Sequence, residues 1–217
     1  MDLFSPCDFG PYRVRNRLVM APMTRLRCGR DGVPSDMVAE YYAQRASMGL
    51  IVTEGAFPDL AARTWLGQPG IETAGQVTGW QKGADAGHAR GGTIVMQIMH
   101  AGRLSHPPIN GTGRVVSASA TTAPGYTHNL SGRVDYVPAE PLTGPEIERS
   151  IESWARAARN AVDAGMGAAR FSQGGRHPLS PPRKAPRPRT RPPHRSQGRG
   201  SPSRSSPQGT VKTKSAA

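Results

Sequence analysis

The five residues Leu50-Ile51-Val52-Thr53-Glu54 decide the fold of this chain. They are rich in β-branched side chains and nearly all apolar, and Gly55 follows them, so they predict a short strand that is covered on both faces. Strands of this kind are typical of parallel sheets, in which helices lie on the faces. The stretch therefore indicates an α/β protein.

The predicted elements around this strand alternate between strand and helix: strands over 17–23 and 93–98, and helices over 36–48 and 76–89. Pro22 ends the first strand, because proline removes a donor from the ladder. Ser35 is a candidate N-cap of the first helix, and Gly49 is a candidate for its C′ position. This order predicts parallel strands joined by right-handed crossover helices.

A further helix is predicted over 143–165, where Thr143 and Glu146 have the spacing of a capping box. An apolar stripe follows at helical spacing, and we expect it to face the core: Ile147, Ile151, Trp154, Ala155, Ala158 and Val162. The polar stretch of 100–141 before this helix predicts a long functional loop. A short fourth strand is expected in 166–171.

Membrane proteins, secreted disulfide scaffolds and zinc proteins are disfavoured. No apolar run approaches the ~20 residues that a membrane helix needs, and the N-terminus has no basic stretch followed by an apolar core. Cys7 and Cys28 are far apart, without a CxxC pair or a histidine cluster. We therefore expect a reduced, cytoplasmic protein that has no membrane partner and holds no metal.

Polar residues stand where the predicted strands end, which is where parallel α/β folds bind ligands: Thr24, Glu54 with Gly55, Gln97, His100 and Arg103. Thr24 by itself is more typical of a hydroxyl that bonds nearby backbone. For Gln97 a binding role and a packing role are balanced, because burying an unpaired amide costs roughly 1–3 kcal/mol. His100 and Arg103 could bind an anion, but structural roles are the commoner ones.

Three segments together closely resemble the old yellow enzyme family of FMN-dependent ene-reductases: 16–25 (NRLVMAPMTR), 42–55 (YAQRASMGLIVTEG) and 97–103 (QIMHAGR). The similarity continues through the helix that follows Leu142. The resemblance implies an FMN-containing (β/α)8 barrel in which NAD(P)H reduces the flavin, and the flavin passes hydride to an activated alkene. In such enzymes the cofactor supplies the hydride chemistry and the protein orients and tunes it.

The resemblance also implies roles for residues at the strand ends. The Thr24 hydroxyl would bond the O4 edge of the flavin, and Gly55 would let the backbone approach the ring because it lacks Cβ. The Gln97 amide would bond the pyrimidine edge, which alternates donors and acceptors as an amide does. The residues that would line the ring are Ala21, Pro22 and Met23.

Part of the family's pattern is absent. In the family, a His-x-x-Asn-Gly-Tyr-like motif on the fourth strand holds the substrate and supplies a proton, whereas residues 167–176 read GAARFSQGGR here. A closed barrel needs roughly 250 residues, so residues 1–171 predict only its N-terminal half, truncated at about the fourth strand. We expect a weak or inactive ene-reductase, and we assign no catalytic residue.

The net charge of +13 divides unevenly along the 217 residues. Residues 1–171 carry 17 basic and 15 acidic side chains, whereas residues 172–217 carry 11 basic and no acidic ones. The second segment also holds nine Pro and eight Ser among 46 residues, so it cannot bury enough surface to offset its ordering entropy. The sequence predicts a partial barrel over 1–171 and a disordered basic tail over 172–217.

Three hypotheses account for this tail, and the plainest is that it only keeps a truncated barrel soluble. Pro/Arg/Ser-rich sequence without acidic residues is typical of GC-rich coding DNA read out of frame, which places a frame change near codon 167. Alternatively, the tail gives a non-catalytic protein that binds nucleic acid or another polyanion. The absence of aromatic residues argues against specific recognition. The sequence does not indicate an oligomeric state.

Overall fold

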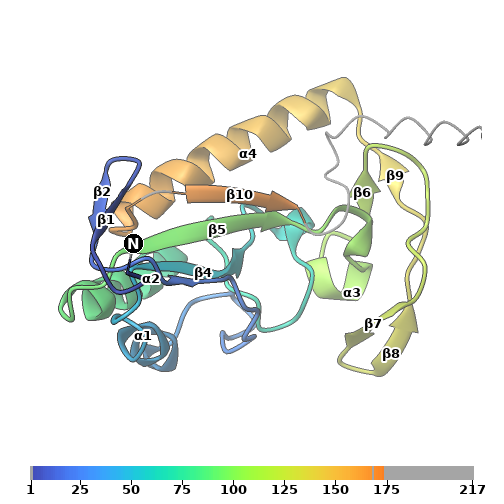
Figure 1. Ribbon diagram of the computed structural model, residues 1–217. Helices are drawn as coiled ribbons and strands as arrows, with labels where there is room; N and C mark the ends of the chain where they lie inside the picture. Colours follow the sequence, from blue (N-terminus) through green and yellow to red (C-terminus); the bar gives the residue numbers. More distant parts are fainter. Residues whose placement is uncertain (1, 168, 174–217) are drawn as a thin grey trace, which may run out of the picture. The chain divides into compact units, whose positions relative to one another are not determined.

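The computed structural model describes residues 2–167 and 169–173, and these build a four-stranded parallel sheet in the order β10-β5-β4-β3 (Figure 1). The strands are β3 (Val19–Met20), β4 (Leu50–Ala56), β5 (Ile94–His100) and β10 (Ala169–Gln173). The expectation of parallel strands is confirmed. The first strand is shorter than the predicted 17–23, and the fourth begins later than residue 166.

Three longer helices connect these strands in the predicted order: α1 (Asp36–Ala43), α2 (Ala74–His88) and α4 (Gly144–Asp163). The N-terminus of α2 is a capping box between Thr73 and Gln76. At the start of α4, Glu146 Oε2 accepts hydrogen bonds of 2.8 Å from both the backbone N–H and the hydroxyl of Thr143. The reach of Glu146 back to Thr143 is thus confirmed.

The core lies where these helices cover one face of the sheet. All seven residues of β4 and all seven of β5 are buried, which explains why both strands read as continuous apolar runs. Trp80 of α2 is fully buried in this cluster, and its indole N–H donates to the Gly70 carbonyl at 2.9 Å. The other face carries a separate small cluster of Leu50, Val52 and Val95.

The stretch 100–141 is not the single long loop that its composition predicted. Short elements divide it, namely η2 (Gly102–Leu104), α3 (Pro107–Asn110), β6 (Val116–Ser117), the hairpin β7 (Tyr126–Asn129) and β8 (Gly132–Asp135), and β9 (Glu140–Pro141), which pairs with β6. An N-terminal hairpin of β1 (Cys7–Phe9) and β2 (Tyr12–Val14) and the turn η1 (Leu60–Ala62) complete the described elements.

The first helix ends earlier than its composition predicted. α1 stops at Ala43 rather than at residue 48, and single turns continue the chain to Met48. Ser35 occupies the N-cap position but makes no side-chain capping bond, because its hydroxyl donates to the Arg27 carbonyl at 3.4 Å. Gly49 is not the C′ residue. It is required there because a Cβ would collide with the backbone carbonyl of Asn16.

The face by which α4 packs differs from the predicted one. Small side chains meet the rest of the molecule, namely Ser150, Ser153, Ala157 and Ala161. Of the predicted stripe, Trp154 and Ala158 pack against the core as expected, whereas Ile151 and Val162 are 55% and 60% exposed and do not face it. The small residues let the helix lie close to the sheet, and the Ser153 hydroxyl donates to Asp59 Oδ2 at 2.7 Å.

Several expectations fall outside the described residues. Of the predicted disordered segment 172–217 only Ser172 and Gln173 are described, and both belong to β10 instead; residues 168 and 174–176 of the stretch 167–176 are not described either. In the described part of the chain, no helix combines the length and the apolar composition that a membrane crossing requires.

Candidate functional site

The parallel pairing of β4 and β5 brings two predicted site residues together. Gly55 and Gln97 are register partners at the carboxyl ends of their strands. The register shifts by one residue between Val52 and Gly55, which is a β-bulge in β4. Bulges re-aim side chains next to functional sites, and this one sets Gly55 opposite Gln97.

Side chains satisfy the backbone groups that the bulge frees from the ladder. The Thr53 hydroxyl oxygen accepts the N–H of Gln97 at 3.1 Å, and the hydroxyl donates to the Glu54 carbonyl at 2.9 Å. The Glu54 N–H donates to the hydroxyl of Tyr42 on α1 at 2.9 Å. Because these groups are buried, each bond removes the cost of an unpaired polar group.

The Gln97 side chain is 9% exposed, and its amide makes no hydrogen bond to any residue that the structure describes. An amide of this kind offers two donor hydrogens and one acceptor oxygen. Both functions are thus available to a ligand at the end of β5. An adjacent donor and acceptor suit a heterocyclic edge on which N–H and C=O groups alternate.

Gly55 has a packing reason of its own. A Cβ at this position would lie 3.0 Å from the Cβ of Met99, so the glycine accommodates that side chain. The Gly55 carbonyl accepts a 2.9 Å bond from the amide of Gln68, whose own oxygen accepts the Thr64 N–H at 2.8 Å. Gln68 is 1% exposed and therefore anchors the end of β4 to the following loop.

The other predicted site residues lie together on the segment that follows β3. Ala21, Met23 and Thr24 are exposed there, and Pro22 is half-buried. Because β3 pairs in parallel with β4, this segment leaves the sheet at the same edge as Gly55.

Glu54 ties this segment to β4. Its Oε2 accepts the N–H of Arg25 at 2.8 Å and the N–H of Leu26 at 3.2 Å, and Leu26 adopts a left-handed conformation with φ of 56°. Thr24 thus directly precedes the anchored residues, while its hydroxyl makes no hydrogen bond within the described part of the chain.

The electrostatics around Glu54 are set by burial. Glu54 is 1% exposed, and desolvation raises the pKa of its carboxyl although the two N–H bonds oppose this. Burial also raises the pKa of the Cys28 thiol to about 12, which excludes a thiolate nucleophile there. Glu54 shares a cavity of about 110 Å³ with Arg25, Arg27 and Tyr41.

His100 and Arg103 make the structural contacts that we judged the commoner outcome. His100 Nδ1 accepts the Gly102 N–H at 2.9 Å. Arg103 donates to the hydroxyls of Ser117 at 2.8 Å and Ser119 at 3.3 Å. Both residues therefore fold the segment after β5.

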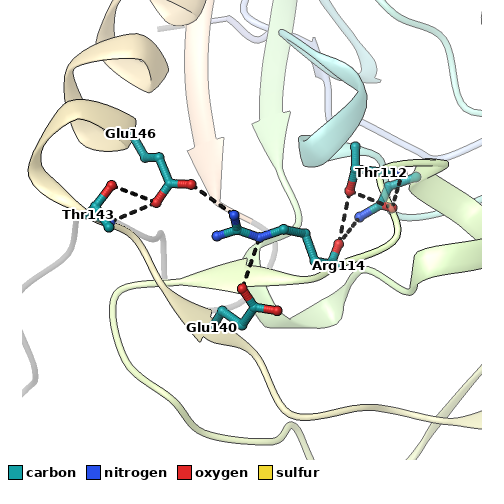
Figure 2. Close-up of polar contacts among 6 residues, drawn as sticks. Thr112, Arg114, Glu140, Thr143 and Glu146 are labelled. Carbon is teal, nitrogen blue, oxygen red and sulfur yellow. Dashed lines mark hydrogen bonds and ion pairs between the residues drawn. The ribbon is translucent and has the colours of Figure 1, made fainter.

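A larger cavity of about 400 Å³ lies beside the first turns of α4, and three of its charged lining residues, Arg114, Glu146 and Arg156, are in ion pairs. Figure 2 shows Arg114 between two carboxylates, at 3.1 Å from Glu140 and 2.9 Å from Glu146. The same Glu146 holds Thr143 at the helix start. The residues that line this cavity include none of the six predicted flavin contacts.

Sequence reasoning noticed Glu54 at a strand end but gave it no role, and it missed Thr53, Gln68 and Tyr42. Their bonds join residues that are 12 to 44 positions apart in the chain. A sequence signal exists only for Glu54, because an acidic residue that ends an apolar strand needs partners.

The comparisons with known proteins show the family of this chain. The sequence model of the NADH:flavin oxidoreductase / NADH oxidase family matches residues 2–169. Flavin oxidoreductase hxnT of Emericella nidulans is 35% identical over 169 residues, which are 76% of this chain and 43% of that protein. A probable flavin mononucleotide-dependent alkene reductase of Leishmania infantum is 35% identical over 170 residues, which are 76% of this chain and 47% of that protein.

Among solved structures, the old yellow enzyme homologue from Zymomonas mobilis matches with a TM-score of 0.76 and 39% identity over 79% of this chain and 48% of that one. The chain therefore spans less than half the length of these relatives. The match supports an α/β fold of the barrel type, and the range matched by the family model, residues 2–169, includes β3, β4 and β5. The chain belongs to the NADH:flavin oxidoreductase / NADH oxidase family, whose members use FMN with NAD(P)H as the electron donor.

Proposed function

We propose that the chain holds the pyrimidine edge of FMN at the carboxyl ends of β3, β4 and β5, as the N-terminal half of an alkene-reducing flavin barrel. The observation that carries this proposal is the Gln97 amide, which belongs to a residue that is 9% exposed, has no partner in the described part of the chain and lies opposite Gly55. A free donor and acceptor at the end of an otherwise buried strand suit a ligand that completes their hydrogen bonds.

The residues present offer the kinds of hydrogen-bond donor and acceptor that the flavin edge would need. The Gln97 amide would donate to a ring carbonyl and accept from a ring N–H, and the Thr24 hydroxyl would donate to the O4 edge. Ala21, Pro22 and Met23 would lie along the ring as an apolar wall. When bound, the flavin supplies hydride transfer from NAD(P)H to an activated alkene, and the chain's residues hold and orient it.

We further infer that flavin binding and turnover are weaker than in full-length relatives. None of the 217 residues forms a His-x-x-Asn-Gly-Tyr motif that would hold the substrate and supply the proton. The usual phosphate site of such barrels follows strands seven and eight, and the matched region makes up less than half of the relatives' length.

Titration of the purified chain with FMN, followed by quenching of flavin fluorescence, tests the proposal. Q97A is expected to weaken binding by about 10- to 100-fold, because two hydrogen bonds in a buried site are lost. The control is Q44A, which changes an exposed glutamine directly after α1. Equal FMN affinity for Q97A, Q44A and the unchanged chain would refute the assignment of Gln97.

Enone reduction with NADPH or NADH by the same preparation tests the inferred weakness. We expect negligible turnover above free FMN. If the purified protein contains stoichiometric flavin and turns over as fast as a full-length ene-reductase, the inferred weakness is wrong. The FMN titration of Q97A would still decide the assignment of Gln97 separately.

A further inference from the structure

The three longer helices pack on one face of the sheet only. Side chains of α1, α2 and α4, among them Tyr42, Trp80 and Ala157, share one core cluster with residues of β4 and β5. The cluster on the other face holds strand residues alone, namely Leu50, Val52 and Val95. Doubly wound sheets carry helices on both faces, whereas a closed barrel carries them outside only. The face without helices thus corresponds to the inside of a barrel wall.

Both edge strands of this wall lack a ladder partner within residues 2–167 and 169–173. The sheet order β10-β5-β4-β3 follows the chain order, so β3 forms one edge and β10 the other. The Leu18 carbonyl points to β4, where it accepts the Leu50 N–H at 3.2 Å. Because the backbone groups of successive strand residues point to opposite sides, the Val19 N–H and C=O point outward. An open edge of this kind is a template for a further strand.

Large apolar side chains are exposed along the β3 edge. Val19 is 55% exposed, and Leu3 and Phe4 of the N-terminal segment are exposed as well. The Arg17 N–H donates to the Leu3 carbonyl at 2.9 Å, so this segment lies directly beside the start of β3. Apolar groups that gather next to an unpaired edge are typical of an interface.

We propose that two copies of this chain close one eight-stranded barrel, in which β3 of each copy pairs in parallel with β10 of the partner subunit. Such barrels close at eight parallel strands, and each copy supplies four. The two-fold axis then coincides with the barrel axis, so all eight strands keep one direction and the same seam occurs twice. This pairing needs no bound flavin.

Other arrangements satisfy fewer edges. If β3 paired with its own copy about a two-fold axis, both β10 edges would stay open and the helices of the two copies would lie on opposite faces of one sheet. Wall strands such as β4 and β5 are continuous apolar runs. No comparable run occurs in the sequence after β10, because the apolar residues of 174–217 are only Leu179, Ala185, Val211, Ala216 and Ala217. The second copy is therefore the partner that matches both edges at once.

Sedimentation velocity of the full chain, without FMN and over a concentration series, tests the closed barrel. A reductant keeps Cys7, which is partly exposed, from forming a disulfide between copies. Two seams and two inner walls make an interface of the obligate class, about 2,000 Å² or more, so we expect mainly dimer at about 10 µM. Closure leaves no free edge, so species that grow beyond two copies would refute it.

A matched pair of charge variants places the interface. Val19 and Ile151 are both 55% exposed, one at the β3 edge and the other on α4. Met20 belongs to the cluster that contains the helices, so the Val19 side chain points to the other face, inside the proposed barrel. V19D should therefore be monomeric throughout, because its carboxylate would be enclosed without a partner. I151D should dimerise as the unchanged chain does.

A second matched pair tests the backbone seam. V19P removes the outward N–H, which an edge strand tolerates, whereas V19T keeps that N–H and the branched shape of the side chain. V19P should weaken the dimer by about 10- to 100-fold more than V19T, since one hydrogen bond is lost from each of two seams. The far-ultraviolet circular dichroism of all four variants should match the unchanged chain. A monomer at every concentration, equal effects of V19D and I151D, or equal effects of V19P and V19T would overturn the proposal.

Discussion

Replacing Glu54 by alanine tests how the flavin-side segment after β3 is held. The Glu54 carboxylate accepts the N–H groups of Arg25 and Leu26 at 2.8 and 3.2 Å. A hydrogen bond to a charged group contributes about 1.5–3 kcal/mol to stability, which gives roughly 3–6 kcal/mol for two such bonds. E54A also removes the cost of keeping a carboxylate buried, which offsets part of this loss. We therefore expect E54A to lower the free energy of unfolding by about 2–4 kcal/mol.

The isosteric variant E54Q separates the two contributions. A glutamine oxygen still accepts both N–H groups, while the buried charge is removed, so E54Q is expected to stay within about 1 kcal/mol of the unchanged chain at pH 7. The Glu54 pKa lies above its ordinary value of 4.5, so the folded state disfavours the ionised form. The cost of burying the ionised carboxyl therefore lowers the stability of the unchanged chain above the raised pKa, and this cost disappears as the pH falls through that pKa. Over that range the free energy of unfolding of the unchanged chain should rise relative to that of E54Q.

Urea unfolding followed by circular dichroism measures these differences, with E40A as the control because Glu40 is exposed on α1. The unchanged chain, E54A, E54Q and E40A should also be compared in FMN titration. We expect E54A to weaken FMN binding more than E54Q, because the segment that carries Thr24 is released. If E54A is as stable as E40A and binds FMN equally well, the anchoring role of Glu54 is wrong.

Three further outcomes are expected. The Glu146 pKa is lowered to about 2, first by its hydrogen bonds with Thr143 and then by Arg114. The ionised carboxyl therefore contributes to stability above pH 4.5, and this contribution is lost as the pH falls toward 2. In urea unfolding, the difference in stability between the unchanged chain and E146Q should close over that range. Deleting residues 172–217 should abolish retention on heparin, and retention of the full chain should fall steeply with salt; salt-insensitive retention would exclude the polyanion hypothesis. Translating the two other frames downstream of codon 167 should yield a His-x-x-Asn-Gly-Tyr-like motif with further strand and helix units, and failure in both frames would exclude the frame change.

The buried strands were predictable because burial on both faces leaves only apolar choices. The runs at 50–54 and 93–98 predicted β4 and β5, but β4 continues to Ala56 through polar and glycine residues. That extension depends on the hydroxyls of Thr53 and Tyr42, which accept hydrogen bonds from the backbone N–H groups of Gln97 and Glu54 at the bulge. A local pattern contains no information on such distant bonds.

The face of α4 was not predictable from periodicity alone. The spacing of Ile147, Ile151 and Val162 correctly indicates a helix with one apolar side, but it does not say what that side meets. Close approach to the sheet favours small residues, so Ala157 and Ala161 occupy the inner face. A stripe of large residues is the stronger signal in the sequence, while here the stripe of small ones makes the closer contact.

The candidate site follows from the same logic of buried polar groups. The two central strands are entirely buried, yet they hold four polar side chains, Thr53, Glu54, Gln97 and His100. Glu54 Oε2 accepts two N–H groups of the segment after β3, which offsets part of the cost of burying the carboxyl. The Gln97 amide has no partner in the described residues, and it lies opposite the glycine that the bulge sets there. An amide without a partner, on a strand end that several long-range bonds hold in register, has the position and the hydrogen-bonding groups that the proposed flavin contact requires.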